Sequence, residues 1–111
     1  MNKITFEDFE SIMSYDIGKK QDSCIEIEFC VDGYLDYQSS WLGKMLDIDT
    51  KKPIYWFGLV ADGSEAYEFS SFEQFANAAV FHGRSITEIW DLISLLSIDA
   101  CEVLERLSFY K

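Results

Sequence analysis

One histidine and three cysteines are the side chains of this chain that most often carry catalytic chemistry. His82 could act as a general base or as a metal ligand, and a thiol of Cys24, Cys30 or Cys101 beside it would make a nucleophilic pair. No spacing along the chain brings these residues together. His82 is expected at the end of a helix, where a capping or surface histidine is the simpler interpretation. A small enzyme that uses His82 with a carboxylate or a thiol is therefore the third and least favoured hypothesis.

The cysteines also indicate the compartment. Their number is odd, and they lack the spacing of a metal site. Cys24 and Cys30 fall on one predicted strand, about 20 Å apart, which is too far for a disulfide. The first residues lack the basic head and apolar run of a signal peptide, and no stretch approaches the roughly 18 apolar residues of a membrane span. We expect reduced thiols in a cytoplasmic protein.

Sites for metals, cofactors and nucleic acid have little support. Asp47 and Asp49 form the tightest acidic pair in a predicted loop, but the other ligands and the glycine of a calcium loop are missing. Gly58 and Gly63 lack the Lys and Ser/Thr of a phosphate-binding loop. Two short lysine pairs do not make the basic face that nucleic acid requires. The sequence therefore predicts no catalytic residue, no metal, no cofactor, and no direct binding to nucleic acid or membrane.

Charge is the strongest feature of the chain. Twenty Asp and Glu stand against nine Lys and Arg, a formal net charge of −11 over 111 residues. The imbalance is concentrated, because no Lys or Arg occurs in residues 21–43 or 53–83. Clustered carboxylates attract basic partners, and the Tyr and Trp residues among them are typical interface anchors. The predicted partner-binding residues are Glu26, Glu28, Asp32, Tyr34, Asp36, Tyr37, Asp62, Glu65, Tyr67 and Glu68.

A fold must bring these residues together, and the hydrophobic pattern predicts a single α+β domain over residues 1–111. Hydrophobic residues make up 49% of the chain, so folding is expected despite the acidity. Thr5 is the expected N-cap of a helix from Phe6 to Tyr15. Residues 24–31 alternate between apolar and polar, which predicts a strand with one buried face. Asp32-Gly33 indicates a hairpin whose return strand starts near Tyr34.

A second hairpin is predicted further along. Residues 39–46 are ambiguous between the end of a strand and a short helix. Pro53 is expected to break the chain before the apolar run 54–60, which predicts a central strand covered on both faces. A turn follows, and residues 65–69 form the return strand. About four strands in two hairpins would then make one antiparallel sheet, from which Glu26, Glu28, Glu65 and Glu68 project in one region.

Two or three helices are expected after the sheet and packed on one of its faces. Capping boxes at Ser70 or Ser71 open a predicted helix that stops at Gly83, and Ser85 with Glu88 opens another that runs through Leu96. Asp99 is the expected N-cap of a last helix.

The segments 68–75 and 81–91 resemble segments of a known class of proteins. Their capped helices and aromatic residues, in a small acidic α+β chain, are similar to those of contact-dependent growth inhibition immunity proteins, a class of bacterial polymorphic toxin immunity proteins. The resemblance covers about the last half of the chain and transfers no individual binding residue. It implies a cytoplasmic antitoxin that binds the C-terminal toxin domain of a cognate effector, expected to be a basic nuclease, and neutralises it by occluding its active site. The alternative is an adaptor or regulatory module whose partner is not a toxin.

Overall fold

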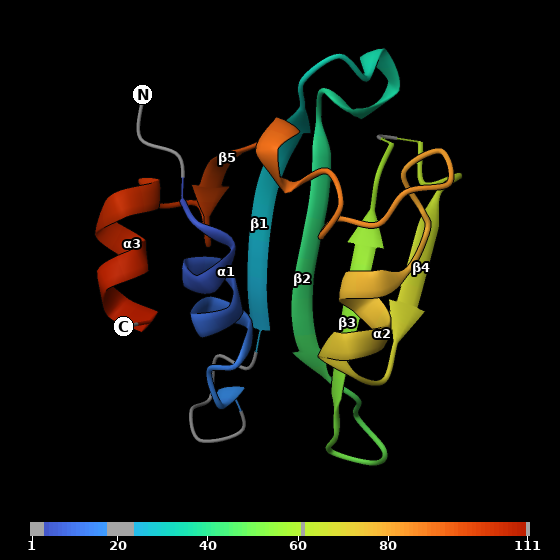
Figure 1. The fold of residues 1–111 in the computed structure, drawn as a ribbon. Helices are drawn as coiled ribbons and strands as arrows, with labels where there is room; N and C mark the ends of the chain where they lie inside the picture. The colour runs from blue at the N-terminus through green and yellow to red at the C-terminus, as the bar shows by residue number, and fades with distance from the viewer. Residues whose placement is uncertain (1–3, 18–23, 61, 111) are drawn as a thin grey trace.

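The computed structural model describes residues 4–17, 24–60 and 62–110, and has an α+β fold with one antiparallel sheet (Figure 1). The strands are β1 (Cys24–Val31), β2 (Ser40–Leu46), β3 (Pro53–Gly58), β4 (Ala66–Phe69) and β5 (Ile93–Ile98). Their order in the sheet is β4-β3-β2-β1-β5. The helices are α1 (Phe6–Met13), α2 (Phe72–Asn77) and α3 (Val103–Tyr110), with short 3₁₀ helices η2 (Leu35–Tyr37) and η3 (Trp90–Leu92). The predicted fold class is confirmed, but the predicted number of four strands is wrong.

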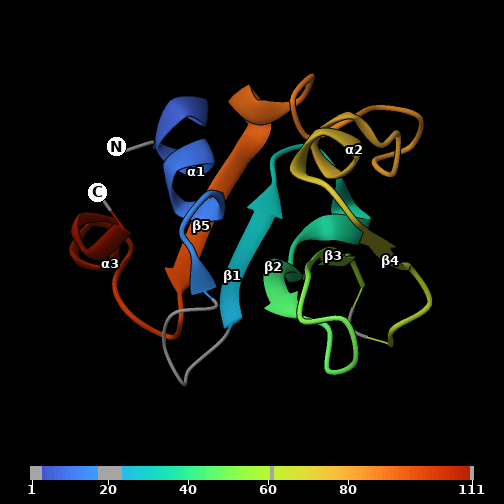
Figure 2. The same ribbon diagram turned by 90° about the horizontal axis from the view of Figure 1, so that it is seen from below.

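The sheet has one covered and one open face. Figure 2 shows α1 and α2 on the same side of the sheet and α3 beyond β5, beside α1. On β1, the side chains at 25, 27, 29 and 31 are fully buried on the covered side, where they meet the aromatic core around Phe9 and Phe75. Within the described part of the chain, no helix lies on the opposite face, and none is long and apolar enough to span a membrane.

Helix α1 begins as the sequence predicts. Thr5 is its N-cap and forms a reciprocal capping box with Asp8. The helix ends at Met13, before the expected Tyr15. Beyond its end, Lys44 reaches from β2 and donates hydrogen bonds to the Met13 carbonyl (2.8 Å) and the Tyr15 carbonyl (2.9 Å). A cation thus occupies the negative end of the helix dipole.

The connection from β1 to β2 is not the predicted tight hairpin. Residues 35–37 form η2, and the return strand begins at Ser40 instead of near Tyr34. Gln38 explains the difference, because its side-chain amide donates to the carbonyls of Val31 (2.7 Å) and Tyr34 (2.8 Å) and so satisfies the loop backbone. The ambiguous segment 39–46 contains a complete strand, β2.

The second predicted hairpin, β3 with β4, is confirmed. Pro53 does not break the chain, since it is the first residue of β3. The expectation that this strand is covered on both faces is wrong. Tyr55 and Phe57 are buried on the covered side, whereas Trp56 is half-buried and lies on the open side. The apolar run therefore predicts a strand correctly, but it does not predict that both faces of the strand are buried.

The predicted helix from Ser85 to Leu96 is wrong. The capping box does form, with hydrogen bonds from Ser85 N to Glu88 Oε1 (2.9 Å) and from Glu88 N to Ser85 Oγ (3.2 Å). It closes only a turn, which leads through η3 into β5. Strand β5 pairs with β1 on the side away from β2, across a β-bulge. The backbone N–H and C=O groups of β1 therefore have partners on both sides. Long-range pairing has overridden the local helix signal.

The ends of the two remaining helices also differ from expectation. Helix α2 is capped by Ser71 but ends at Asn77, before the predicted stop at Gly83. Helix α3 forms as predicted, but Asp99 is not its cap. The Glu102 carboxylate accepts from the backbone N–H groups of Leu104 (3.1 Å) and Glu105 (3.0 Å) instead.

Candidate functional site

Two rows of residues cross the open face of the sheet. The strand register places paired residues on the same side, because cross-strand partners share a face. One row consists of Glu26, Gly43, Trp56 and Glu68. The neighbouring row consists of Glu28, Trp41, Gly58 and Ala66. We call these eight positions the open-face rows. In each row a tryptophan lies beside a glycine, and a glutamate stands at an end.

The glycines allow the indole rings to lie close to the sheet. A Cβ at position 43 would stand 2.6 Å from Trp56 Cζ2 and 2.0 Å from the Ile25 carbonyl oxygen, distances at which atoms overlap. A Cβ at Gly58 would lie 3.8 Å from Trp56 Cζ3, an ordinary van der Waals contact. Gly43 is thus required by the position of the Trp56 ring and by the close approach of β1.

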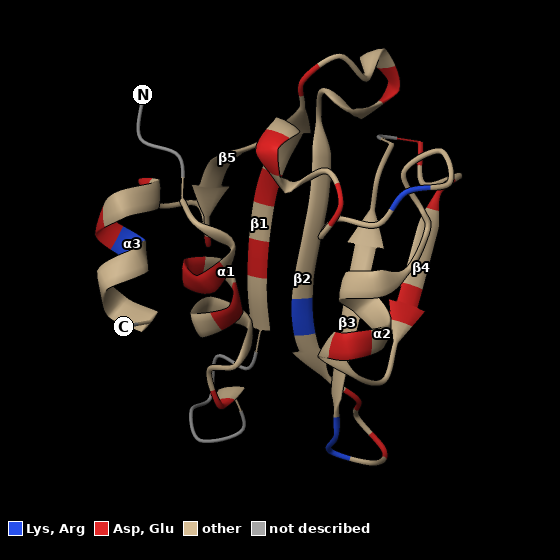
Figure 3. Ribbon diagram, viewed as in Figure 1, with Lys and Arg blue, Asp and Glu red and all other residues tan. Residues whose placement is uncertain are grey.

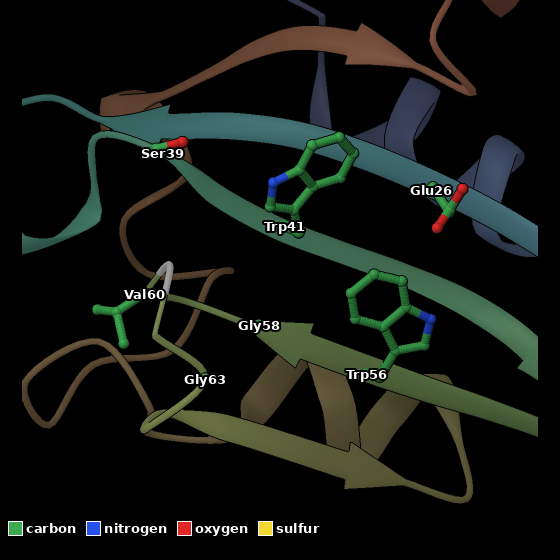
Figure 4. A pocket seen from close by; sticks show the side chains of 7 residues that line it. All are labelled: Glu26, Ser39, Trp41, Trp56, Gly58, Val60 and Gly63. Atoms are coloured by element: carbon green, nitrogen blue, oxygen red, sulfur yellow. The ribbon is translucent and has the colours of Figure 1, made fainter.

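A groove runs along this face. Its volume is about 460 Å³, and its lining residues are Glu26, Ser39, Trp41, Trp56, Gly58, Val60 and Gly63 (Figure 4). In Figure 4, both indoles and the Glu26 carboxylate project to the same side of the sheet, from three adjacent strands. Trp41 is 38% exposed, which is unusual for a side chain of this size. The groove therefore offers aromatic surface and a carboxylate together.

The charges of this face have one sign. Figure 3 shows acidic residues along β1 and β4 and a basic residue on β2, which by the bounds of that strand is Lys44. Lys44 is buried on the covered side, where it binds the end of α1. Among the described residues, the other Lys and Arg lie outside the strands, at 51, 52, 84 and 106. The charged groups of the open-face rows are consequently all carboxylates.

The structure brings three of the four predicted carboxylates together. Glu26, Glu28 and Glu68 belong to the open-face rows. Glu65 does not, since it lies one position before Ala66 and its Oε1 accepts a hydrogen bond from Tyr37 Oη at 2.7 Å, toward the core. Tyr67 is half-buried and pairs with Phe57 on the covered side. The expectation that Glu65 shares the region of the other three is wrong.

The remaining predicted residues lie around the ends of the strands. Asp32, Tyr34, Asp36 and Tyr37 follow β1, and Tyr37 is only 1% exposed. Burial first, and then the bond to Glu65, raise the pKa of the Tyr37 hydroxyl. Asp62 lies in the β3–β4 turn, where its Oδ1 accepts from Ser64 N at 2.9 Å. These residues make turns and core contacts and are not part of the open-face rows.

His82 is not at the end of a helix. It lies in a turn with positive φ (53°), five residues after α2. Its ring stacks on Tyr34 and Tyr37, with centroids 5.6 and 5.0 Å away, and its Nε2 is 3.3 Å from Asp36 Oδ2. His82 thus has the carboxylate partner that acid–base chemistry would need, Asp36. Both residues line a shallow hollow of the surface. Among the described residues, the groups found against His82 are Tyr34, Tyr37 and Asp36, and none of them is a thiol.

The predicted set of partner-binding residues lacks the aromatic centre of the site, Trp41 and Trp56, together with the two glycines. A signal for it exists: Trp41-Leu42-Gly43 and Trp56-Phe57-Gly58 are two copies of a Trp-x-Gly pattern. Alternate residues of a strand share a face, so each copy places an indole and an empty position on one side. Antiparallel pairing then sets each tryptophan opposite the glycine of the other copy.

No metal site accompanies the groove. Over residues 4–17, 24–60 and 62–110, no group of three or more His, Cys, Asp or Glu is arranged to hold an ion. Comparison of the chain with protein-family models, with curated proteins and with solved structures yields no match. The function is therefore argued from the open-face rows and their chemistry.

Proposed function

We propose that this chain is an immunity protein that binds a basic toxin domain, of the nuclease type, through the open face of its sheet. The observation that carries the proposal is the composition of the open-face rows. Trp41 and Trp56 form a flat aromatic centre, and Glu26, Glu28 and Glu68 stand at its margins. Aromatic anchors surrounded by charges of one sign are typical of interfaces with an oppositely charged partner.

The charges supply speed and partner choice. Oppositely charged proteins associate at about 10⁸–10⁹ M⁻¹s⁻¹ at low salt, against about 10⁵–10⁶ for neutral pairs. An inhibitor that must capture a nuclease before the enzyme reaches its substrate benefits from that difference. The net charge of −11 extends this attraction beyond the contact surface.

The aromatic centre supplies the stability of the complex. Removal of exposed indole surface from water is favourable by about 25 cal/mol per Å², and it also shields neighbouring ion pairs from solvent. The Lys and Arg residues with which a nuclease holds phosphates would pair with the carboxylates of the rows. The bound sheet would then cover the active site and exclude the nucleic acid.

The first test is protection of cells. The chain is co-expressed with candidate toxin domains encoded beside its gene, and purified mixtures are examined for a complex. We expect rescue of growth, a stable complex, and an association rate that falls steeply with ionic strength. Absence of both protection and complex would contradict the proposal. Tight binding to a neutral or acidic partner, insensitive to salt, would favour an adaptor or regulatory module instead.

Charge reversal locates the binding face. Glu26→Lys and Glu28→Lys should each slow association severalfold at low salt, because these carboxylates lie in the open-face rows. Glu10→Lys and Glu105→Lys are matched controls on helices α1 and α3, and both positions are exposed. An equal effect of the two pairs would mean that the acidity serves solubility rather than recognition.

A further inference from the structure

We infer that the groove between Trp41 and Trp56 is a receptor for an arginine side chain of the partner. This inference rests on the proposed function and deepens it, because it names the chemical group that enters the open-face rows. The groove combines two indole faces, a carboxylate, and a stretch of floor without a side chain at Gly58.

Gly58 determines what fits on the floor of the groove. Gly43 is covered by the Trp56 ring, whereas Gly58 lines the groove and has no side chain, so a flat group can lie along the sheet there. The groove continues over Gly58 to Val60 and Gly63 at the β3–β4 turn. Its volume of about 460 Å³ is within the range of sites for small ligands, so one long side chain can be accommodated.

The chemistry of the walls favours a guanidinium. A cation over the face of a tryptophan is attracted by the ring quadrupole, and tryptophan is the best of the aromatic residues for this contact. Arginine is planar and weakly hydrated, so it can stack on an indole while its N–H groups bind a carboxylate, whereas lysine is a strongly hydrated point charge. Glu26 lines the groove beside Trp56 and is the expected acceptor of those N–H groups.

Other occupants fit the face less well. A second copy of this chain would bring Glu26, Glu28 and Glu68 against carboxylates of the same sign, which costs binding energy. A neutral sugar would stack on the indoles but would not use the surrounding negative charge. The charge of the rows therefore selects a cationic group.

Nuclear magnetic resonance can test the groove without the toxin. The indole N–H groups of the ¹⁵N-labelled full chain are followed during titration with a tri-arginine peptide, a tri-lysine peptide and a neutral oligosaccharide at low salt. Trp90 is an internal control, because it is 8% exposed and its Nε1 donates to the Ile4 carbonyl at 2.9 Å. We expect tri-arginine to shift the Trp41 and Trp56 signals but not that of Trp90, with at least severalfold tighter binding than tri-lysine.

Two variants complete the test. Glu26→Gln should weaken tri-arginine binding severalfold, whereas Glu105→Gln on α3 should leave it unchanged. The inference is overturned if neither indole responds, if tri-lysine or the oligosaccharide binds as tightly as tri-arginine, or if Glu26→Gln has no effect. Protection of cells without an arginine response would remove the receptor and leave the proposed function. An arginine response without protection or complex would remove the proposed function and leave the arginine receptor.

Discussion

The indole ring of Trp56 lies across Gly43, its cross-strand partner, so closely that a Cβ at position 43 would be 2.6 Å from Trp56 Cζ2. The same Cβ would be 2.0 Å from the Ile25 carbonyl oxygen. A single missing side chain thus allows the indole to rest on the sheet and allows β1 and β2 to approach each other. The candidate site and the stability of the sheet depend on the same residue.

Gly43→Ala is therefore expected to destabilise the protein. The added methyl group must displace both backbone and ring, and overpacking of this kind costs about 1–3 kcal/mol. Gly58→Ala is the matched control, because its Cβ would meet Trp56 Cζ3 at 3.8 Å. Urea unfolding of the two variants measures the difference. Similar free energies of unfolding would contradict the account of Gly43.

Lys44→Met should destabilise the protein by about 1–3 kcal/mol, because the buried Met13 carbonyl and the part-buried Tyr15 carbonyl at the end of α1 each lose a donor. The net loss is moderated by the cost of burying the ammonium group, which lowers the pKa of Lys44. Lys51→Met is the control, since Lys51 is exposed in the β2–β3 connection. Thermal unfolding of the two variants tests this, and equal midpoints would mean that the ammonium is not a net stabiliser.

Asp99→Asn should loosen α3 from the sheet. The Asp99 carboxylate accepts from Glu26 N at 2.9 Å, from Arg106 Nε at 2.9 Å, and from the Tyr110 hydroxyl. Its side chain is only 16% exposed, so loss of the charge should cost about 2–3 kcal/mol. Hydrogen exchange over residues 103–110 should accelerate in this variant and not in the exposed control Asp91→Asn. Unchanged protection of α3 would refute the anchoring role.

Stability should fall in alkaline solution. Burial, followed by the hydrogen bonds to Glu65 and Asp99, raises the pKa values of Tyr37 and Tyr110 in the folded state. An unfolded tyrosine titrates near pH ~10, so this contribution is complete below about pH 10 and is lost as the pH rises further. The lowered pKa of Lys44 acts in the opposite direction. Urea midpoints measured from neutral pH upward should decline above pH ~10.

Tyr110→Phe isolates one part of this alkaline effect. The variant cannot lose a phenolic proton, so its free energy of unfolding should decline less steeply with pH than that of the parent chain. Tyr34→Phe is the control, because the Tyr34 ring stacks on Tyr37 and His82 and the substitution keeps that ring. A slope for Tyr110→Phe identical to that of the parent would assign the alkaline loss to other groups.

Local sequence patterns predict an element correctly where the tertiary structure favours the same conformation. The alternation in residues 24–31 predicted β1, and Thr5 predicted the start of α1. Glu26 and Glu28 share a face because the strand period of two places alternate residues on one side, whereas Glu68 joins them through the register of four strands.

The errors arose where a local signal competes with distant partners. The Ser85–Glu88 capping box is a real hydrogen-bonded feature, yet the segment after it pairs with β1, more than sixty positions earlier in the chain. Glu65 was placed on the wrong side because the prediction joined it to Glu68, three residues away, although a strand alternates with period two. The register, and not the number of acids, decides which carboxylates meet.

The excess of negative charge, the alternating strand β1, the capped first helix and the two Trp-x-Gly patterns can all be read from the chain, because each depends on residues that are close in sequence. The position of β2 between β1 and β3 emerges only on folding, and with it the placement of each tryptophan opposite a glycine and near a glutamate. Strand order and register follow from the burial of one face and the pairing of distant backbones, and a local pattern contains neither.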